Sequence, residues 1–373
     1  MQKKDPPILV TRPSLPPVEE YESLVREIFS SRYLTNGGAQ HQKLESALKE
    51  KLASPYMRLF TNGHLALECA ISALNLEPGE IITTPFTFIS TTHAIVRCGF
   101  TPVFCDVEPD YFTLDPALLE RLITPRTRAI LPVHVYGNPC DMEAIDAIAK
   151  RHNLPVLYDA AHAFGVTVHG RAVASYGTAS MFSFHATKCY NTIEGGAVAC
   201  HDAAYAELLN GYKNFGFHAD EEIREVGGNA KMNEFQAAMG LLNLKYFDRE
   251  IERRAHVAAQ YRANLSGIDG LAFRPIPDGV TQNFAYLPVS FDPAVFGANR
   301  DEVSDTLKTF GVFARKYFYP LASEAACYAG KYHAKETPVA LQASKSVLTL
   351  PMYADLALSD VDDICEIVAS CKK

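Results

Sequence analysis

Three short segments of the sequence hold groups that could act together in chemistry. Thr61-Asn62-Gly63-His64 precedes an amphipathic helical pattern, Asp159 ends an apolar run, and Lys188 follows another apolar run. The start of a helix offers unpaired N–H groups that suit a phosphate, and glycine lets an anion approach the backbone closely. A carboxylate at a strand end can face a cation, and a partly desolvated lysine can form a Schiff base with an aldehyde.

Each segment also has an ordinary interpretation. Asn62-Gly63 is a common turn dipeptide, Asp159 could cap a helix, and most lysines lie at the surface. In combination, however, the segments supply a phosphate cradle, an acid for a ring nitrogen and an amine for an aldehyde. These are the three groups that pyridoxal phosphate needs, so this cofactor is the hypothesis that the combination favours.

The elements around these segments alternate between strand and helix. Strands are predicted at 80–84, 101–107, 128–134, 155–159, 180–184 and 196–200, with helices at 67–74, 92–97, 116–123 and 141–152. The strands are nearly all apolar, which indicates burial on both faces in a parallel sheet covered by helices. Ligands bind at the carboxyl ends of such strands, where the candidate residues fall. His134 also lies there, and we expect it to be a buried structural histidine.

The rest of the chain is predicted to form a smaller α+β part. A long helix at 233–265 resembles a connector, followed by strands at 284–289 and 311–317 and helices at 301–310 and from 360 onward. We therefore expect a large domain over 1–245 and a small domain over 246–373, with the arm 1–30 packing on the small domain.

Composition excludes several classes of function. The 373 residues carry a net charge of −8 without a basic cluster, so neither nucleic acid nor a membrane surface is an expected partner. The N-terminus lacks the apolar segment of a signal peptide, and no apolar run is long enough to span a bilayer. The nine cysteines are an odd number without a CxxC pair, which predicts reduced thiols, a cytoplasmic protein and no metal site.

The order of motifs resembles that of the DegT/StrS-type sugar aminotransferases. The matching segments are Thr61-Asn62-Gly63, residues 85–91, Tyr158-Asp159-Ala160-Ala161-His162-Ala163, residues 183–188 and Glu194-Gly195-Gly196, and the likeness extends to residues 350–353. The resemblance implies the aspartate aminotransferase architecture of fold type I. In that α/β architecture, a large domain has a mostly parallel, seven-stranded sheet between helices, and a smaller α+β domain follows.

The resemblance also implies roles for individual residues. Lys188 would form the Schiff base with pyridoxal phosphate, and Asp159 would keep the pyridine nitrogen protonated. Phe88 would stack on the ring, although core packing is its ordinary alternative. The residues that would bind the phosphate are Asn62, Gly63, His64 and Ser183. Asn229 would reach the same phosphate from a neighbouring subunit, so the resemblance implies a homodimer with shared active sites.

The sequence departs from the family pattern at two positions. His64 stands where a hydroxyl residue is usual, so only its backbone N–H can serve the phosphate. His162 stands where glutamine is common, as a partner for the phenolic oxygen of the ring, and its tautomer would then matter. His185 and Tyr319 are possible substrate contacts, for which a structural role is the alternative.

The segments at 12–17, 34–38 and 132–141 look like those of enzymes that make dTDP-4-amino-4,6-dideoxyglucose. The resemblance implies that glutamate donates its amino group to a nucleotide-linked 4-keto-6-deoxy sugar, for O-antigen or other surface polysaccharide. The galacto epimer, a 3-amino sugar and another pyridoxal-phosphate reaction on the same fold stay open as alternatives. A cofactor-binding regulator is a further rival, but no added DNA-binding module is evident.

Overall fold

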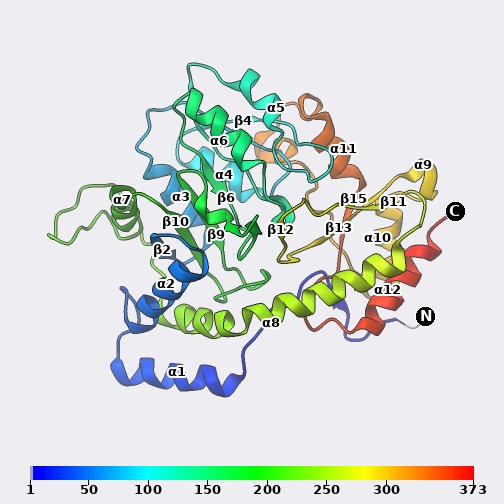
Figure 1. Ribbon diagram of the computed structural model, residues 1–373, viewed down its shortest axis with the longest axis horizontal. Coiled ribbons are helices and arrows are strands. Elements are labelled where there is room, and N and C mark those ends of the chain that lie inside the picture. Colours follow the sequence, from blue (N-terminus) through cyan, green and yellow to red (C-terminus); the bar gives the residue numbers. More distant parts are fainter. Residues whose placement is uncertain (1–2) are drawn as a thin grey trace.

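The structure is a computed structural model that describes residues 3–373, and its main body is a sheet between two layers of helices (Figure 1). The strands of this sheet are β2 (Tyr56–Phe60), β3 (Glu80–Thr83), β4 (Thr101–Phe104), β5 (Thr127–Ile130), β6 (Leu157–Asp159), β9 (Ala179–Ser183) and β10 (Gly196–Cys200). They form one group in the order β4-β3-β5 and another in the order β6-β9-β10-β2. Parallel bridges from Ile130 to Val156 and from Val133 to Asp159 join the two groups.

The sheet confirms the predicted mostly parallel, seven-stranded arrangement. Only β10 runs antiparallel to its neighbours, β9 and β2. The pairs β3–β4, β3–β5 and β6–β9 are parallel. Parallel strands need crossover helices, which explains why strands and helices alternate along this half of the chain.

Two apolar clusters cover the opposite faces of the sheet. Neighbouring residues of one strand divide between them: Met181 joins one cluster and Phe182 the other, because side chains alternate along a strand. On one face lie α3 (Gly63–Ser72), α4 (Ser90–Arg97) and α7 (Ala203–Lys213). On the other lie α2 (Ala39–Lys51), α5 (Pro116–Leu119), α6 (Met142–Arg151) and the first half of α8 (Glu234–Leu265). Burial of both faces explains the continuous apolar character of the strands.

Helix α8 is 32 residues long and runs from the sheet to the C-terminal part of the chain (Figure 1). A capping box begins it, in which the Asn233 side chain accepts from the Gln236 N–H and the Gln236 side chain accepts from the Asn233 N–H. The predicted helix at 233–265 is confirmed. The domain boundary predicted at residue 245 falls within this helix and stays a prediction.

The second half of α8 packs on a separate apolar cluster. Val257, Tyr261 and Leu265 meet the antiparallel sheet of β11 (Leu271–Phe273), β13 (Leu287–Phe291) and β15 (Val347–Leu350). Helices α10 (Arg300–Thr309) and α12 (Leu358–Ser370) complete the cluster. The remaining short elements are β7 (Thr167–Val168), β8 (Arg171–Ala172), β12 (Val280–Thr281), α9 (Pro293–Phe296) and α11 (Pro338–Ser346).

Two predicted strands of this part differ from the structure. The strand expected at 311–317 is only β14 (Val312–Phe313), and the one expected at 284–289 begins at Leu287. Residues 283–285 do not join the sheet because Asn283 bonds instead to the loop after β6. Apolar residues alone cannot distinguish a strand from a loop anchored in this way.

The N-terminal segment contacts both parts of the molecule. Strand β1 (Ile8–Leu9) pairs in parallel with β14, and Lys4 bonds to Asp360 at 2.6 Å. Helix α1 (Val18–Ser31) then lies along α8, where Phe29 meets Phe235 edge to face. Within residues 3–373, no helix is both long enough and apolar enough to cross a membrane.

Candidate active site

The fold brings the main candidate residues to one edge of the sheet. Asp159 is the last residue of β6, Ser183 is the last residue of β9, and Lys188 lies in the loop that follows β9. Helix α3 starts just after the neighbouring strand β2, so its N-terminus faces the same edge. Residues far apart in the sequence meet here because the strand ends are adjacent in the sheet.

Asp159 is a buried carboxylate held by two donors. The Thr91 hydroxyl donates to Oδ2 at 2.7 Å, and the Ala161 N–H donates to Oδ1 at 3.1 Å. Burial raises the pKa of Asp159, while Thr91, Ala161 and the nearby Lys188 each act to lower it. Thr91 was not predicted as a site residue, although it lies in the quoted 85–91 motif.

Lys188 is half-buried, and burial lowers the pKa of its amine. The negative charge of Asp159 acts in the opposite direction. Lys188 Nζ lies 3.4 Å from the hydroxyl of Tyr286, its only hydrogen-bond partner within residues 3–373. The amine is therefore more easily deprotonated than that of a surface lysine, as nucleophilic and proton-transfer roles require.

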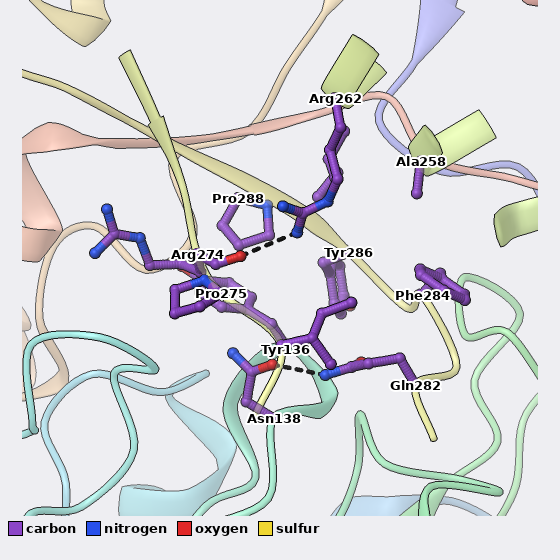
Figure 2. A pocket seen from close by; sticks show the side chains of 12 residues that line it. Tyr136, Asn138, Ala258, Arg262, Arg274, Pro275, Gln282, Phe284, Tyr286 and Pro288 are labelled. Atoms are coloured by element: carbon purple, nitrogen blue, oxygen red, sulfur yellow. Dashed lines mark hydrogen bonds between the residues drawn. The ribbon is translucent and has the colours of Figure 1, made fainter. Parts of the chain in front are cut away.

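Tyr286 reaches the lysine from the C-terminal part of the chain. Asn283 Nδ2 donates to the carbonyls of His162 and Phe164 at 2.8 and 3.0 Å, which fixes the segment before Tyr286. In addition, Gln282 donates to Asn138 at 2.8 Å (Figure 2). The cavity in Figure 2, which Tyr286 also lines, has a volume of only about 30 Å³ and is too small for a substrate.

The hydrogen bonds of His162 define its tautomer, which the sequence left open. Its Nδ1 accepts a hydrogen bond from the Tyr136 N–H at 3.1 Å. Burial and the charge of Lys188 hold the pKa of His162 well below its usual value, so the ring is neutral. A neutral ring that accepts at Nδ1 carries its proton on Nε2, which is then the donor.

The turn before α3 has the shape of an anion cradle. The Asn62 side chain caps the helix by accepting from the Leu65 N–H at 2.9 Å. Gly63 and His64 begin the helix, so their N–H groups have no acceptor inside it. A Cβ on Gly63 would lie 2.8 Å from Ser183 Cβ, and one on Gly196 would lie 2.7 Å from Gly63 Cα. Glycine at both positions keeps the turn against the Ser183 hydroxyl.

The His64 side chain takes no part in this cradle. Its Nδ1 bonds to the Ser90 hydroxyl at 2.8 Å, and its Nε2 lies 3.0 Å from Glu68 Oε1. Both ring nitrogens are therefore occupied beside the turn. This leaves the backbone N–H of His64 to meet an anion, and its role toward a phosphate stays a prediction.

Phe88 and Tyr319 lie together in a larger cleft of about 470 Å³. Both side chains are more than half exposed. Tyr317 and three cationic side chains, Lys308, Arg315 and Lys316, share the lining. An open cleft with aromatic and basic walls suits a ligand that carries both a ring and phosphate groups.

Two predicted site residues, His185 and Asn229, lie outside the group formed by Asp159, Lys188 and the turn at Gly63. His185 is exposed, bonds to Thr187 at 2.8 Å and faces Glu194 at 3.4 Å. Asn229 is exposed and pairs through its backbone with Asn214, in the loop after α7. His134 is fully buried, accepts from the Cys140 N–H at 3.0 Å and stacks on Tyr158, which is the structural role expected for it.

The arrangement fits pyridoxal phosphate on three observations of this structure. The glycine-lined turn offers free N–H groups and a hydroxyl to a phosphate, a buried carboxylate stands at the neighbouring strand end, and a lysine with a lowered pKa lies near that carboxylate. No cluster of His, Cys, Asp or Glu side chains that could hold a metal occurs within residues 3–373.

Comparisons with known proteins agree with this geometry. The DegT/DnrJ/EryC1/StrS aminotransferase family matches residues 18–369. The chain is 42% identical to a dTDP-4-amino-4,6-dideoxy-D-glucose transaminase from Shigella dysenteriae, over 98% of both chains. It is 40% identical to a transaminase of the same name from Escherichia coli, over 94% of this chain and 95% of that protein.

Among solved structures, the fold matches that of DesI, determined in the presence of its TDP-sugar product. The TM-score is 0.95 at 34% identity, and the match covers all of this chain and 94% of DesI. The likeness therefore extends over the C-terminal apolar cluster as well as over the sheet that carries Asp159.

Proposed function

The chain belongs to the DegT/DnrJ/EryC1/StrS aminotransferase family, and we propose that it transfers an amino group from glutamate to a dTDP-linked 4-keto-6-deoxy sugar. It is a pyridoxal-phosphate-dependent sugar aminotransferase of fold type I. The proposed product is dTDP-4-amino-4,6-dideoxyglucose, as the names of the two transaminases suggest. The observation that carries the proposal is the convergence of Asp159, Lys188 and the turn at Gly63 on one edge of the sheet.

Different residues at this edge of the sheet would bind different groups of the cofactor. The N–H groups of Gly63 and His64 and the hydroxyl of Ser183 would bind the phosphate, in a turn shaped by the Asn62 cap. Asp159, fixed by Thr91, would hold a proton at the ring nitrogen. His162 Nε2 would donate to the phenolic oxygen, and Phe88 would cover the ring.

Pyridoxal phosphate, when bound, supplies an electron sink that makes the α-proton of an amino acid removable. Lys188 carries the proton. In the first half-reaction its Nζ would take the α-proton of the amino donor and give it up to the cofactor, and in the second it would take a proton back from the cofactor and deliver it to the sugar carbon that receives the amino group. The lowered pKa of Lys188 keeps a larger fraction of the amine neutral, and therefore able to accept a proton, near neutral pH.

The nucleotide sugar would lie in the cleft lined by Phe88 and Tyr319. Lys308, Arg315 and Lys316 offer positive charge for its diphosphate, and the aromatic side chains offer faces for its rings. These contacts with the nucleotide would position the sugar ketone at the reaction site, although the contacting side chains do not touch the reacting atoms. His185, exposed beside the loop of Lys188, is a second possible contact.

The functional unit that we propose is a homodimer in which Asn229 enters the phosphate site of its partner. The loop after α7 projects from the body of the molecule (Figure 1) and exposes Phe215, Phe217, Ile223 and Val226. An exposed apolar group of this kind on a soluble enzyme suggests a contact surface. Asn229 lies at the end of the same loop and bonds to none of the residues around Lys188 in its own chain.

The proposed location is the cytoplasm, and the proposed pathway is that of a surface polysaccharide such as O-antigen. All nine cysteines are free thiols, most of them buried, which suits a reducing compartment. The nucleotide-linked substrate points to polysaccharide synthesis.

The substrate proposal is tested by incubating the purified protein with dTDP-4-keto-6-deoxyglucose and glutamate, followed by NMR of the product. We expect an equatorial 4-amino sugar and an equal amount of 2-oxoglutarate. An axial amine would identify the galacto epimer instead, and an inert mixture would reject this substrate.

The dimer proposal is tested by mixing two inactive variants, Lys188→Ala and Asn229→Ala. If Asn229 acts on the partner's site, a mixed dimer holds one intact site, and random mixing should restore roughly a quarter of the wild-type activity. No recovery after verified subunit exchange would show that Asn229 does not act across the interface.

A further inference from the structure

Two threonine hydroxyls form a chain that ends at the carboxylate of Asp159. Thr91 Oγ1 lies 2.7 Å from Asp159 Oδ2, and Thr87 Oγ1 lies 3.0 Å from Thr91 Oγ1. Thr91 is fully buried, and Thr87 and Asp159 are only 4% and 5% exposed. The three side chains are therefore linked by hydrogen bonds in a place from which solvent is largely excluded.

The start of α4 sets the spacing of the two threonines. Thr87 lies in the bend before this helix, and Thr91 lies in its first turn. The Thr91 N–H donates to the Phe88 carbonyl at 3.2 Å, so the chain is already helical from Phe88 onward. Side chains four residues apart are neighbours on one face of a helical turn, which brings the two hydroxyls together. Asp159 reaches Thr91 from the end of β6.

The carboxylate fixes the direction of both hydrogen bonds. An ionised carboxylate can only accept, so the Thr91 hydroxyl donates to Asp159. A hydroxyl has a single hydrogen, so Thr91 has none left for Thr87 and accepts from it instead. The Thr87 hydroxyl is therefore a donor, and both O–H groups are oriented toward Asp159.

Hydrogen bonds aligned in this way strengthen one another. When Thr91 accepts from Thr87, its own O–H group is more strongly polarised and is a better donor to Asp159. The hydrogen bond from Thr91 lowers the pKa of Asp159, whereas burial raises it. Among the charged side chains, Lys188 acts on Asp159 and also lowers this pKa. Because burial has removed most of the water around the carboxylate, each remaining donor has a larger effect than it would at the surface.

The neighbouring residue of α4, Thr92, provides a contrast. It is also fully buried, but its Oγ1 has no hydrogen-bond partner within residues 3–373. Successive side chains of a helix point about 100° apart, so Thr92 does not share the direction of Thr91. Burial of a threonine at this point of the fold therefore does not by itself create such a bond, and the chain belongs to the side of α4 that faces Asp159.

We propose that Thr87 is a positioning residue for Asp159, and that it acts through Thr91 to keep the carboxylate ionised and oriented. This role rests on the proposed function, in which Asp159 holds a proton at the ring nitrogen of the cofactor. The hydrogen bonds themselves are a property of the folded chain alone. Thr87 also lines the cleft that contains Phe88, so the chain runs from the wall of the proposed substrate cleft to the carboxylate.

The positioning role is tested in the cofactor-free protein by ¹³C NMR titration of the aspartate carboxyl groups. The signal of Asp159 is identified by its absence from Asp159→Asn. Thr87→Val keeps the shape of the side chain but removes the hydroxyl, and we expect it to raise the proton affinity of Asp159 about threefold, seen as a higher pKa. Thr91→Val should raise it further, because it removes the direct donor. Thr87→Ser restores a hydroxyl and should return the pKa to the wild-type value.

The matched control is Thr92→Val, which removes a buried hydroxyl from the same helix without touching the chain. It should leave the pKa of Asp159 unchanged. An unchanged pKa in Thr87→Val, or an equal rise in Thr92→Val, would overturn the proposal. Thr87→Ala is titrated in the same way if Thr87→Val does not fold.

A measurement on the cofactor-loaded protein separates this proposal from the proposed function. We expect Thr87→Val to weaken the affinity for pyridoxal phosphate about threefold, and Thr92→Val to leave it unchanged. Turnover of the keto sugar together with an unchanged pKa of Asp159 in Thr87→Val would reject the role of Thr87 and leave the proposed function intact. A raised pKa in a protein that converts no keto sugar would support the hydrogen-bond chain and count against the proposed function.

Discussion

Lys188 is half-buried and Lys213 is buried, and the two lysines meet different surroundings. Burial lowers the pKa of both. Lys188 faces the carboxylate of Asp159 and the hydroxyl of Tyr286, whereas Lys213 is acted on both by the carboxylate of Glu45 and by the cations Arg58 and Lys231. Desolvation is thus common to the two sites, and the difference lies in the charges around each amine.

This difference separates a reacting amine from an amine that takes no part in the reaction. At Lys188, an opposite charge partly offsets burial, and the amine lies near the carboxylate that would hold the cofactor. At Lys213, the charge of Glu45 opposes burial, the cations Arg58 and Lys231 add to it, and no acid is bonded to the amine within residues 3–373. A lowered lysine pKa therefore does not identify a catalytic residue until its partners are known.

The largest expected effect belongs to Lys188→Ala. Loss of the proton carrier should lower kcat by about 10⁴-fold, whereas Lys213→Met should leave most of the activity. Steady-state kinetics with the keto sugar and glutamate provide the measurement. If the two variants lost activity to the same degree, the distinction between the two lysines would fail.

Asp159→Asn is expected to have the next largest effect, lowering kcat by about 10²-fold. The amide keeps the size of the carboxylate and can still accept from Thr91, but it cannot hold a proton at a ring nitrogen. Circular dichroism should show that the fold is retained. Activity close to wild type would remove the carboxylate from the mechanism.

Tyr286→Phe is expected to lower kcat about tenfold, with little change in KM, because it removes one hydrogen bond that orients Lys188 Nζ. A hydrogen bond to an ammonium is stronger than one to a neutral amine, so its loss should lower the pKa of Lys188 further. NMR titration of reductively ¹³C-methylated lysines in the cofactor-free protein would measure this shift. An unchanged pKa would mean that Tyr286 does not bond to the amine.

The smallest expected effect concerns stability. The pKa of Lys213 is about 8 in the folded chain and near 10.5 when unfolded, so the unfolded state binds more protons between these values. The unfolding free energy should therefore rise with pH from about 8 to 10.5, and Lys213→Met should remove this slope. At pH 7, the variant should be more stable by about 1 kcal/mol. Urea unfolding at several pH values tests this, and a destabilised variant would show that the lysine supports the fold.

Most of the fold and the central residues of the site could be predicted from the sequence. The apolar strands and the helix at 233–265 followed from local patterns that burial on one or two faces imposes. Lys188, Asp159 and Gly63 were singled out because each follows a strand or begins a helix, but their roles were assigned only from their combination and from the family resemblance. The strand expected at 311–317 was largely wrong, because most of that segment is a loop in the wall of the Phe88 cleft.

The sequence by itself determined which groups were available: an amine, an acid, a glycine turn and the strands that end beside them. Only the tertiary structure decided their partners. It brought Thr91 to Asp159 and Tyr286 to Lys188, and it fixed the tautomer of His162 through the Tyr136 N–H. These contacts join residues 26 to 98 positions apart, and no local pattern encodes such pairs, because they depend on how separate elements pack.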